Sequence, residues 1–219
     1  MIDVVIPSKT NLINKVMLEN CITTLRQSDG EQTFNVMVIE SGVIVDCGQD
    51  LTIKYNMYGG PQFCYNHALN LGINESENEW VVLINNDLIF RNTWMSEIIE
   101  AYNERPDIES FSPWNDMWDW HSRMFDINST NIIEGYNIGR ELCGWCIIAR
   151  RSIFDKFSLS ERVNFWYSDN VYADSLREFG IKHALVISSK VDHIVSQTKQ
   201  VSAVEAQLSY FDYIAKKEI

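Results

Sequence analysis

Apolar and polar positions along the chain follow two periods, and the changes between them predict an alternation of strands and helices. Short runs rich in valine and isoleucine, typical of strands, lie over 3–7, 34–39, 52–56, 80–84, 109–112, 142–149, 183–188 and 191–194. Helical spacing of apolar residues lies over about 18–29, 62–71, 92–102, 169–179 and 203–214. Helices that alternate with strands indicate the α/β class, with a mostly parallel central sheet flanked by helices.

Residues that start or stop helices mark several boundaries. Gly30, Gly72 and Gly180 stand where three helices should end, because glycine is common just after a last helical turn. Ser168 stands where a capping residue would begin the helix over 169–179. The final helix should pack on the body through one apolar face, formed by Val204, Leu208, Phe211 and Ile214.

The periodic pattern fails between Trp114 and Arg140, where tryptophan, aspartate and asparagine mix without a clean period. Such a stretch predicts a long functional loop or an irregular cover. No internal repeat or obvious linker interrupts the sequence, and its length suits one domain. We therefore expect a single domain over 1–219.

Composition and charge narrow the range of partners. Of 219 residues, 46% are hydrophobic and 22% are charged, which is typical of a soluble folded protein. Against 30 Asp and Glu residues stand 18 Lys and Arg residues, so the net charge of −12 disfavours general affinity for nucleic acid or anionic membranes. No apolar stretch approaches the roughly 18 residues of a membrane span, and the expected location is the cytoplasm.

The five cysteines are an odd number and are scattered, which suits a reducing compartment better than a set of disulfides. Only Cys143 and Cys146 lie close together, in the order Cys-Gly-Trp-Cys, which resembles a thiol redox motif. They lie late in the chain and precede an apolar run, whereas such motifs normally lie where an early strand meets a helix. A thiol oxidoreductase is therefore an alternative and not the preferred interpretation.

Polar residues follow directly after three predicted strands, where an open α/β sheet binds its ligands. These positions are Pro7-Ser8, Glu40-Ser41-Gly42 and Asn85-Asn86-Asp87. Oxygen atoms of such side chains can bind Mg²⁺ or Mn²⁺. Because the sequence has no GxxxxGK or GxGxxG loop, a diphosphate would need a metal or basic side chains for its binding.

The order of these motifs resembles that of GT-A fold glycosyltransferases, specifically the inverting family 2 enzymes that use nucleotide sugars. The likeness runs from Val4 to about Thr198. Its segments are the strand that ends in Pro7-Ser8, the acid Glu40, the asparagine-containing helix after Gly60, the Asn85-Asn86-Asp87 motif and the strand from Gly144 to Arg151. The resemblance implies a Rossmann-like GT-A domain, with nucleotide-sugar binding over 1–113, acceptor and catalytic residues over 114–200 and a C-terminal helix over 201–219.

The resemblance also implies the residues of the donor and metal sites. Glu40 would recognise the nucleoside of the donor. Asp87 and His193 would hold Mn²⁺ or Mg²⁺, with Asn85 in place of the family's first acid. The remaining donor-binding residues would be Pro7, Ser8, Asn66, Asn85 and Asn86.

The same resemblance implies the catalytic residues. Aligned on Gly180, Asp169 takes the place of the family's general base, and Ser168 takes that of the acid before it. The carboxylate of Asp169 would accept the proton of the acceptor hydroxyl. Arg150 or Arg151 could help to neutralise the departing diphosphate, and a surface role at the start of a helix is the equal alternative for each.

The tryptophan-rich stretch is the candidate acceptor cover, because exposed aromatic rings stack on sugars. The candidate acceptor residues are Trp114, Asp116, Trp118 and Trp145. The resemblance implies transfer of a hexose or pentose from a nucleoside diphosphate sugar, with a UDP-sugar as first choice, to an acceptor hydroxyl.

The acceptor is open between a saccharide, a protein and a small metabolite. The use of Ile, Asn and Lys in the sequence also resembles that of tailed-phage proteins. A hydroxymethylated base of phage DNA, modified in the host cytoplasm, is therefore a further candidate acceptor. The alternative function is that of a sugar-nucleotide-binding protein without catalysis.

Overall fold

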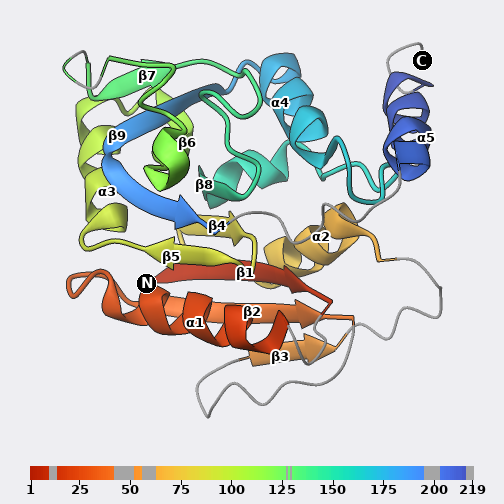
Figure 1. Cartoon of the computed structure of the whole chain (residues 1–219), viewed down its shortest axis with the longest axis horizontal. Coiled ribbons are helices and arrows are strands. Elements are labelled where there is room, and N and C mark those ends of the chain that lie inside the picture. The colour runs from red at the N-terminus through yellow and green to blue at the C-terminus, as the bar shows by residue number, and fades with distance from the viewer. Residues whose placement is uncertain are drawn as a thin grey trace.

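The computed structural model describes residues 1–9, 14–41, 52–55, 63–126, 128, 130–194 and 203–215. Among the predicted features, Gly42, Asn56 and Gly60 lie outside these ranges. Figure 1 shows a twisted sheet with helices on both of its faces. None of the helices in the described ranges is long and apolar enough to cross a membrane.

The chain forms alternating strands and helices, as predicted. The strands are β1 (Ile2–Ser8), β2 (Phe34–Glu40), β3 (Thr52–Tyr55), β4 (Trp80–Ile84), β5 (Leu88–Phe90), β6 (Ile108–Trp114), β7 (Ile132–Glu134), β8 (Cys146–Arg150) and β9 (Lys182–His193). The helices are α1 (Asn14–Gln27), α2 (Tyr65–Glu75), α3 (Trp94–Glu104), α4 (Ser168–Glu178) and α5 (Ala203–Ala215), with short 3₁₀ turns η1 (Met117–Asp119) and η2 (Arg151–Asp155).

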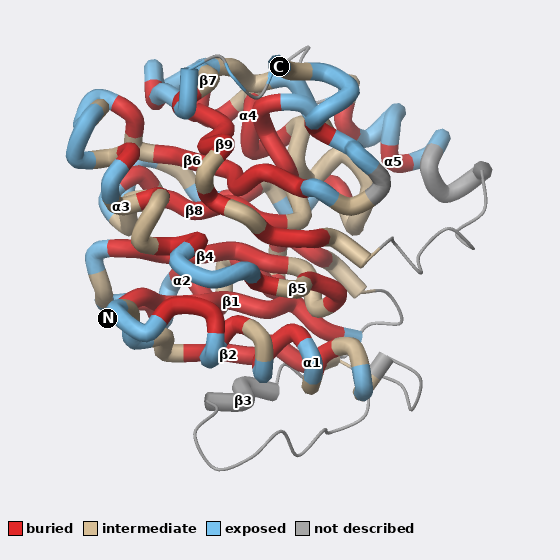
Figure 2. Tube along the Cα trace, turned by 60° about the vertical axis from the view of Figure 1, so that its left-hand side comes forward, coloured by how far each residue is buried: buried red, intermediate tan, exposed pale blue. Residues whose placement is uncertain are grey.

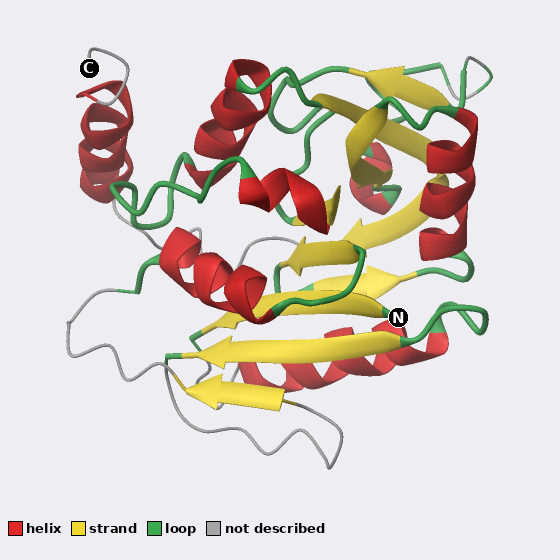
Figure 3. Cartoon of the chain, turned by 180° about the vertical axis from the view of Figure 1, so that it is seen from behind, coloured by secondary structure: helices red, strands yellow, loops and turns green. Residues whose placement is uncertain are grey.

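In the described part of the chain, nine strands form one sheet with the order β3-β2-β1-β4-β8-β6-β9-β5, and β7 pairs with β9. Figure 3 shows the sheet from the side opposite to that of Figure 1. β1 pairs in parallel with β2 and β4, and β2 with β3. β8 runs antiparallel between β4 and β6, whereas β6 and β9 are parallel. The prediction of an α/β fold with a mostly parallel central sheet is confirmed, and the parallel strands end at one edge of this sheet.

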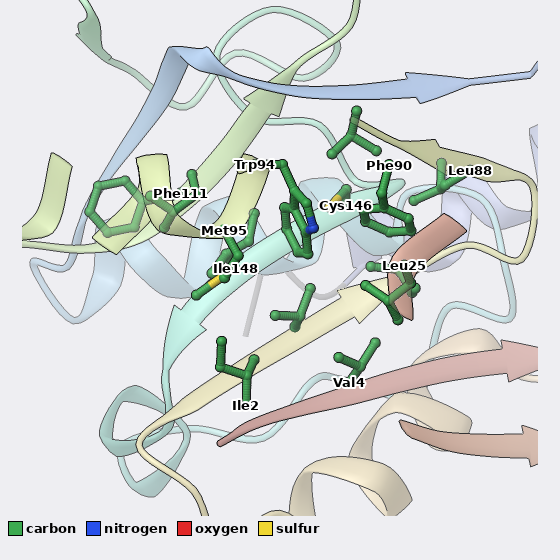
Figure 4. Close-up of a cluster of buried hydrophobic side chains, with 14 of the residues drawn as sticks. Ile2, Val4, Leu25, Leu88, Phe90, Trp94, Met95, Phe111, Cys146 and Ile148 are labelled. Carbon is green, nitrogen blue, oxygen red and sulfur yellow. The ribbon is translucent and has the colours of Figure 1, made fainter. Parts of the chain in front are cut away.

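Side chains that alternate along the central strands point into two cores, one on each face of the sheet. Val4 and Ile6 of β1 belong to the core under α1 and α3, whereas Val5 belongs to the core under α2 and α4. Figure 4 shows the first core, in which Trp94 of α3 lies beside Phe90, with 4.7 Å between the ring centroids. Figure 2 shows that the central strands are buried along most of their length, so the hydrophobic effect fixes the sheet between two helical layers.

α2 does not stop at Gly72 as predicted but continues to Glu75. Ser76 ends it, and its Oγ donates a hydrogen bond to the backbone O of Gly72 at 2.8 Å. A Cβ at Gly72 would lie 2.7 Å from Cγ2 of Val5. The glycine is therefore needed because the helix backbone approaches β1 closely.

Three further predictions need correction. Ser168 is not a cap: it is the first residue of α4, its Oγ donates to the backbone O of Phe165, and Tyr167 takes the N-cap position. The two strands predicted over 183–188 and 191–194 are one strand, β9, which pairs with β6 as far as Lys190 and with β5 from Val191 to His193. The stretch predicted to be irregular contains β7, which pairs with β9.

Of the face predicted to attach α5, Ile214 packs against the cluster of Val163, Val171 and Tyr213, but two other members are exposed. Leu208 and Phe211 are 58% and 59% exposed, whereas Tyr213 is 8% exposed. The Tyr213 ring stacks on Tyr167 with a centroid distance of 5.4 Å. The side chain of Val204 lies outside the described ones. Aromatic stacking at one end of α4, together with the packing of Ile214, attaches this helix.

We expect Gly72→Ala to lower the free energy of unfolding by about 1–3 kcal/mol, because the added methyl group would overlap the buried side chain of Val5. Urea denaturation measures this change. Gly30→Ala is the matched control, since a Cβ there meets nothing within 4 Å. Equal stability of the two variants would contradict the close contact between α2 and β1.

Candidate active site

The ends of β1 and β2 bring together the first predicted site residues. The strands are in register, so that Ser8 lies beside Glu40 and Pro7 beside Ile39. The backbone N–H of Ser41 donates to the O of Ser8 at 2.9 Å, which continues the pairing past the strand end. The side chains of Ser8 and Glu40 are buried. These residues lie at the same sheet edge as the end of β4.

The loop after β4 carries Asn85, Asn86 and Asp87, and backbone hydrogen bonds hold it at both ends. The N–H of Asn85 donates to the O of Trp145 at 2.9 Å, and the O of Asp87 accepts from the N–H of Ile194 at 3.0 Å. The loop is therefore tied both to the segment that enters β8 and to the segment that leaves β9.

Asp87 and His193 face each other at this edge. β5 pairs antiparallel with β9, with Leu88 opposite His193, and this pairing brings Oδ1 of Asp87 to 3.2 Å from Nε2 of His193. The distance suits an ion pair, but within the described ranges both buried atoms lack a well-aligned hydrogen bond. The His193 ring stacks on Trp145 at 5.4 Å between centroids. Two unsatisfied ligand atoms held this close could share a cation.

The pair fits the predicted metal site in chemistry and supplies only part of its ligands. Among the described residues, no group of three His, Cys, Asp or Glu side chains could hold a metal ion. Mg²⁺ typically keeps several waters and binds through one or two carboxylates plus substrate phosphates. Asp87 and His193 are thus the residues that would hold a cation, together with oxygens from outside the protein.

Asp169 lies in the first turn of α4. The N-cap residue of this helix is Tyr167, which has a left-handed backbone conformation with a φ of 68°. Its Oδ1 accepts a hydrogen bond from the N–H of Asn170 at 2.9 Å. Burial raises the pKa of the Asp169 carboxyl above its ordinary value, although this hydrogen bond opposes the shift. A carboxylate with a raised pKa is a better proton acceptor, which is what a general base requires.

Gly144 provides the space that Asp169 occupies. A Cβ at position 144 would lie 2.5 Å from Cβ of Asp169 and 3.0 Å from its Oδ2. Both residues line a cavity of about 10 Å³, which is room for roughly one water molecule, together with Tyr65 and Tyr172. The predicted base is therefore packed tightly on one side and borders a small cavity.

Tyr65 is a residue that no sequence motif selects, although it lies between the other candidates. It begins α2, is buried, and donates its hydroxyl hydrogen bond to Oδ1 of Asn85 at 2.8 Å. Burial and the nearby carboxylates of Asp169 and Asp87 raise the pKa of Tyr65 further above its ordinary value. The phenol is therefore neutral. Only the packing of α2 against the loop after β4 reveals this position.

Asn66 and Trp114 have structural contacts and no exposed surface. Asn66 is fully buried, and its Nδ2 donates to the O of Ser160 at 2.8 Å. Trp114 is fully buried, packs against Leu185, and donates its Nε1–H to Asp116. Asn66 holds the segment before α4 and also lines the cavity beside Asp169, where its Oδ1 has no partner among the described residues. Trp114 belongs to the core and offers no surface to an acceptor.

The remaining acceptor candidates differ in position. Asp116 is exposed and lies 3.6 Å from Nζ of Lys190. Trp145 is half-buried and stacks on His193, so it adjoins the candidate metal ligands. The side chain of Trp118 is not among the described ones. Trp145 is the acceptor candidate that the structure brings into the site.

The paired cysteines lack the surroundings of a redox centre. Cys143 and Cys146 are free, fully buried thiols, and burial raises the pKa of each. Sγ of Cys143 lies 3.4 Å from Nε2 of His121, whose pKa burial lowers to about 4. A neutral thiol beside a neutral imidazole is not an activated nucleophile, which counts against the thiol oxidoreductase alternative.

Arg150 and Arg151 lie at the opposite edge of the sheet from the loop after β4. The register pairs Arg150 with Trp80, at the start of β4, and its guanidinium lies 5.0 Å from the Trp80 ring. Arg151 forms an ion pair with Asp155 at 2.9 Å. Neither arginine lies beside the loop after β4, so the role beside the diphosphate is corrected. Both lie at the start of η2, as the alternative role predicted, and stabilise the far end of β4.

The fold is similar to that of two glycosyltransferases of known structure. The mannosyltransferase PcManGT from Pyrobaculum calidifontis, in complex with GDP-Man and Mn²⁺, aligns with a TM-score of 0.68 and 11% identity over 99% of this chain. S. aureus TarS 1-349 aligns with a TM-score of 0.60 and 10% identity over 87% of this chain. The chain spans 63% and 59% of these two proteins, less than two thirds of either. No protein-family model and no curated protein matches the sequence.

We expect Asp169→Asn to make the protein more stable than the wild type at pH 7, with a difference that disappears as the pH falls below the ordinary pKa of aspartate. A raised pKa means that the fold favours the protonated carboxyl, so stability is lost as the pH rises through the folded pKa. Thermal unfolding of both proteins between about pH 3 and pH 7 measures this difference, because this range extends below the ordinary pKa of aspartate. Parallel pH profiles would contradict the burial of the carboxylate.

Proposed function

We propose that the protein transfers a sugar from a nucleoside diphosphate sugar to an acceptor hydroxyl, with inversion at the anomeric carbon. The observation that carries this proposal is the facing pair of Asp87 and His193 at the carboxyl edge of a sheet with a glycosyltransferase fold. Their unsatisfied buried atoms support the binding of a divalent cation, with Mn²⁺ as first choice because the similar mannosyltransferase was solved with Mn²⁺.

In this proposal, Asp169 is the general base. Its carboxylate accepts the proton of the acceptor hydroxyl while the hydroxyl oxygen bonds to the anomeric carbon. The bond between this carbon and the diphosphate oxygen breaks, and the diphosphate leaves with the electron pair. The cation, when bound, supplies positive charge beside the diphosphate. Burial of Asp169 supports the role because a raised pKa strengthens the base.

The donor would lie across the ends of β1, β2 and β4. Glu40 and Ser8 are neighbours in the register of the sheet, and Asn85 begins the adjoining loop. The acceptor would approach over Trp145, which offers a half-buried aromatic surface beside His193. Its chemical class stays open among a saccharide, a protein, a small metabolite and a modified DNA base.

We expect metal-dependent binding of UDP or GDP, measured by calorimetric titration with and without Mn²⁺. Asp87→Ala should weaken binding in Mn²⁺ at least about tenfold, because it removes a carboxylate from the cation. Asp155→Ala is the matched control, since this exposed acid lies at the other end of the sheet and pairs with Arg151. Failure of the wild type to bind either nucleotide would refute the proposed function.

We expect Asp169→Asn to bind the nucleotide as the wild type does and to lose about 10²–10⁴-fold in the rate of transfer, because an amide cannot take the proton. The rate is measured as release of nucleoside diphosphate from a nucleotide sugar, with water or a sugar identified in an acceptor screen as the acceptor. Undiminished turnover would assign the base to another residue. Unchanged binding with lost turnover also separates an enzyme from a protein that only binds nucleotide sugars.

A further inference from the structure

The hydrogen bond between Tyr65 and Asn85 joins α2 to the loop that carries Asp87. Oη of Tyr65 donates to Oδ1 of Asn85 at 2.8 Å. The phenol ring lies edge-on to Phe63 and Phe165, with centroid distances of 6.4 and 5.7 Å. The backbone N–H of Tyr65 donates to the O of Asn164 at 2.6 Å. These contacts fix both the ring and its hydroxyl.

Three of the four hydrogen-bonding groups of Asn85 have protein partners. Its N–H donates to the O of Trp145, its backbone O accepts from Sγ of Cys21 at 3.6 Å, and Oδ1 accepts from Tyr65. Within the described ranges, Nδ2 of Asn85 makes no hydrogen bond and is not among the buried unpaired atoms. The amide nitrogen is therefore the group that Asn85 offers to a ligand.

The direction of the hydrogen bond determines what this group can bind. The hydroxyl of Tyr65 donates to Oδ1, so the oxygen of the amide faces Tyr65 and the nitrogen faces away from it. The NH₂ group of an amide donates hydrogen bonds to oxygen atoms. Its nitrogen has no available lone pair with which to bind a cation. Asn85 therefore presents a hydrogen-bond donor two residues from Asp87, where the oxygen ligands of a cation would lie.

We propose that Tyr65 is a positioning residue that holds Asn85 as a hydrogen-bond donor to a diphosphate oxygen of the bound nucleotide, and that Asn85 is not a metal ligand. The inference rests on the proposed function and deepens it. It gives a physical reason for asparagine at this place in the motif, since a carboxylate has no proton to donate and would repel a diphosphate.

Calorimetric titration with the nucleoside diphosphate that the wild type binds tests the proposal, as a double-mutant cycle of Tyr65→Phe and Asn85→Ala. We expect about tenfold weaker binding for Asn85→Ala and about three- to tenfold for Tyr65→Phe. The double variant should bind as Asn85→Ala does, because Tyr65 acts through Asn85. Equal losses from Tyr65→Phe in both backgrounds would overturn the positioning role.

A second comparison does not depend on substituting Tyr65. The factor by which Mn²⁺ strengthens nucleotide binding should be the same in the wild type and in Asn85→Ala, because a residue that contacts only the diphosphate does not change the metal's contribution. A factor reduced about tenfold would overturn the proposal and make Asn85 a metal ligand.

Tyr136→Phe is the matched control for the loss of a hydroxyl. Tyr136 donates to the backbone O of Ile181 at 2.9 Å, away from the loop after β4, so its removal should leave nucleotide affinity unchanged. A loss of affinity equal to that of Tyr65→Phe would show a general effect of removing a phenol and overturn the inference. If the wild type binds no nucleoside diphosphate, the proposed function itself fails, and with it this inference.

Discussion

The antiparallel pairing of β5 with the end of β9 is the constraint on which the site depends. In the sheet, β8 and β6 separate β4 from β9, so residues after β4 do not reach β9 by direct strand pairing. The loop over Asn85 to Asp87 crosses this distance, and β5 then pairs with β9 from its outer side. The hydrogen bond from Ile194 to Asp87 completes the connection. A carboxylate and an imidazole from distant parts of the sequence thereby become neighbours.

Close packing at two glycines shapes the other side of the site. Gly72 lets α2 approach β1, and Gly144 leaves room for the carboxyl of Asp169 at the start of α4. The same packing that stabilises the hydrophobic core under these helices removes water from Asp169 and raises its pKa. Burying the carboxylate of Asp169 lowers the stability of the protein. Active sites commonly hold ionisable groups in such destabilising surroundings.

A shared fold does not by itself fix an activity, because one architecture supports many sites. The likeness to the two glycosyltransferases is at low sequence identity, so the residues must carry the functional argument. They do so unevenly. Asp87 and His193 face each other at the sheet edge and Asp169 borders the small cavity, as the proposed roles require, whereas the burial of Trp114 leaves Trp145 as the aromatic surface beside the candidate metal ligands.

The sequence by itself determined the order of strands and helices, because the periods of apolar residues reflect which side of each element is buried. It also determined the three strand ends where the polar motifs lie, since such motifs follow the strands directly. The tertiary structure decided which polar residues are exposed and which partners they meet. Asn66 and Trp114 lie at positions that the sequence assigned to ligand binding, and yet both are buried. Arg150 and Arg151 lie at the end of β4 opposite the polar loop. Tyr65 belongs to no sequence motif. It lies beside Asn85 only because α2 packs on the loop after β4, and the spacing of the two residues along the chain does not predict this contact.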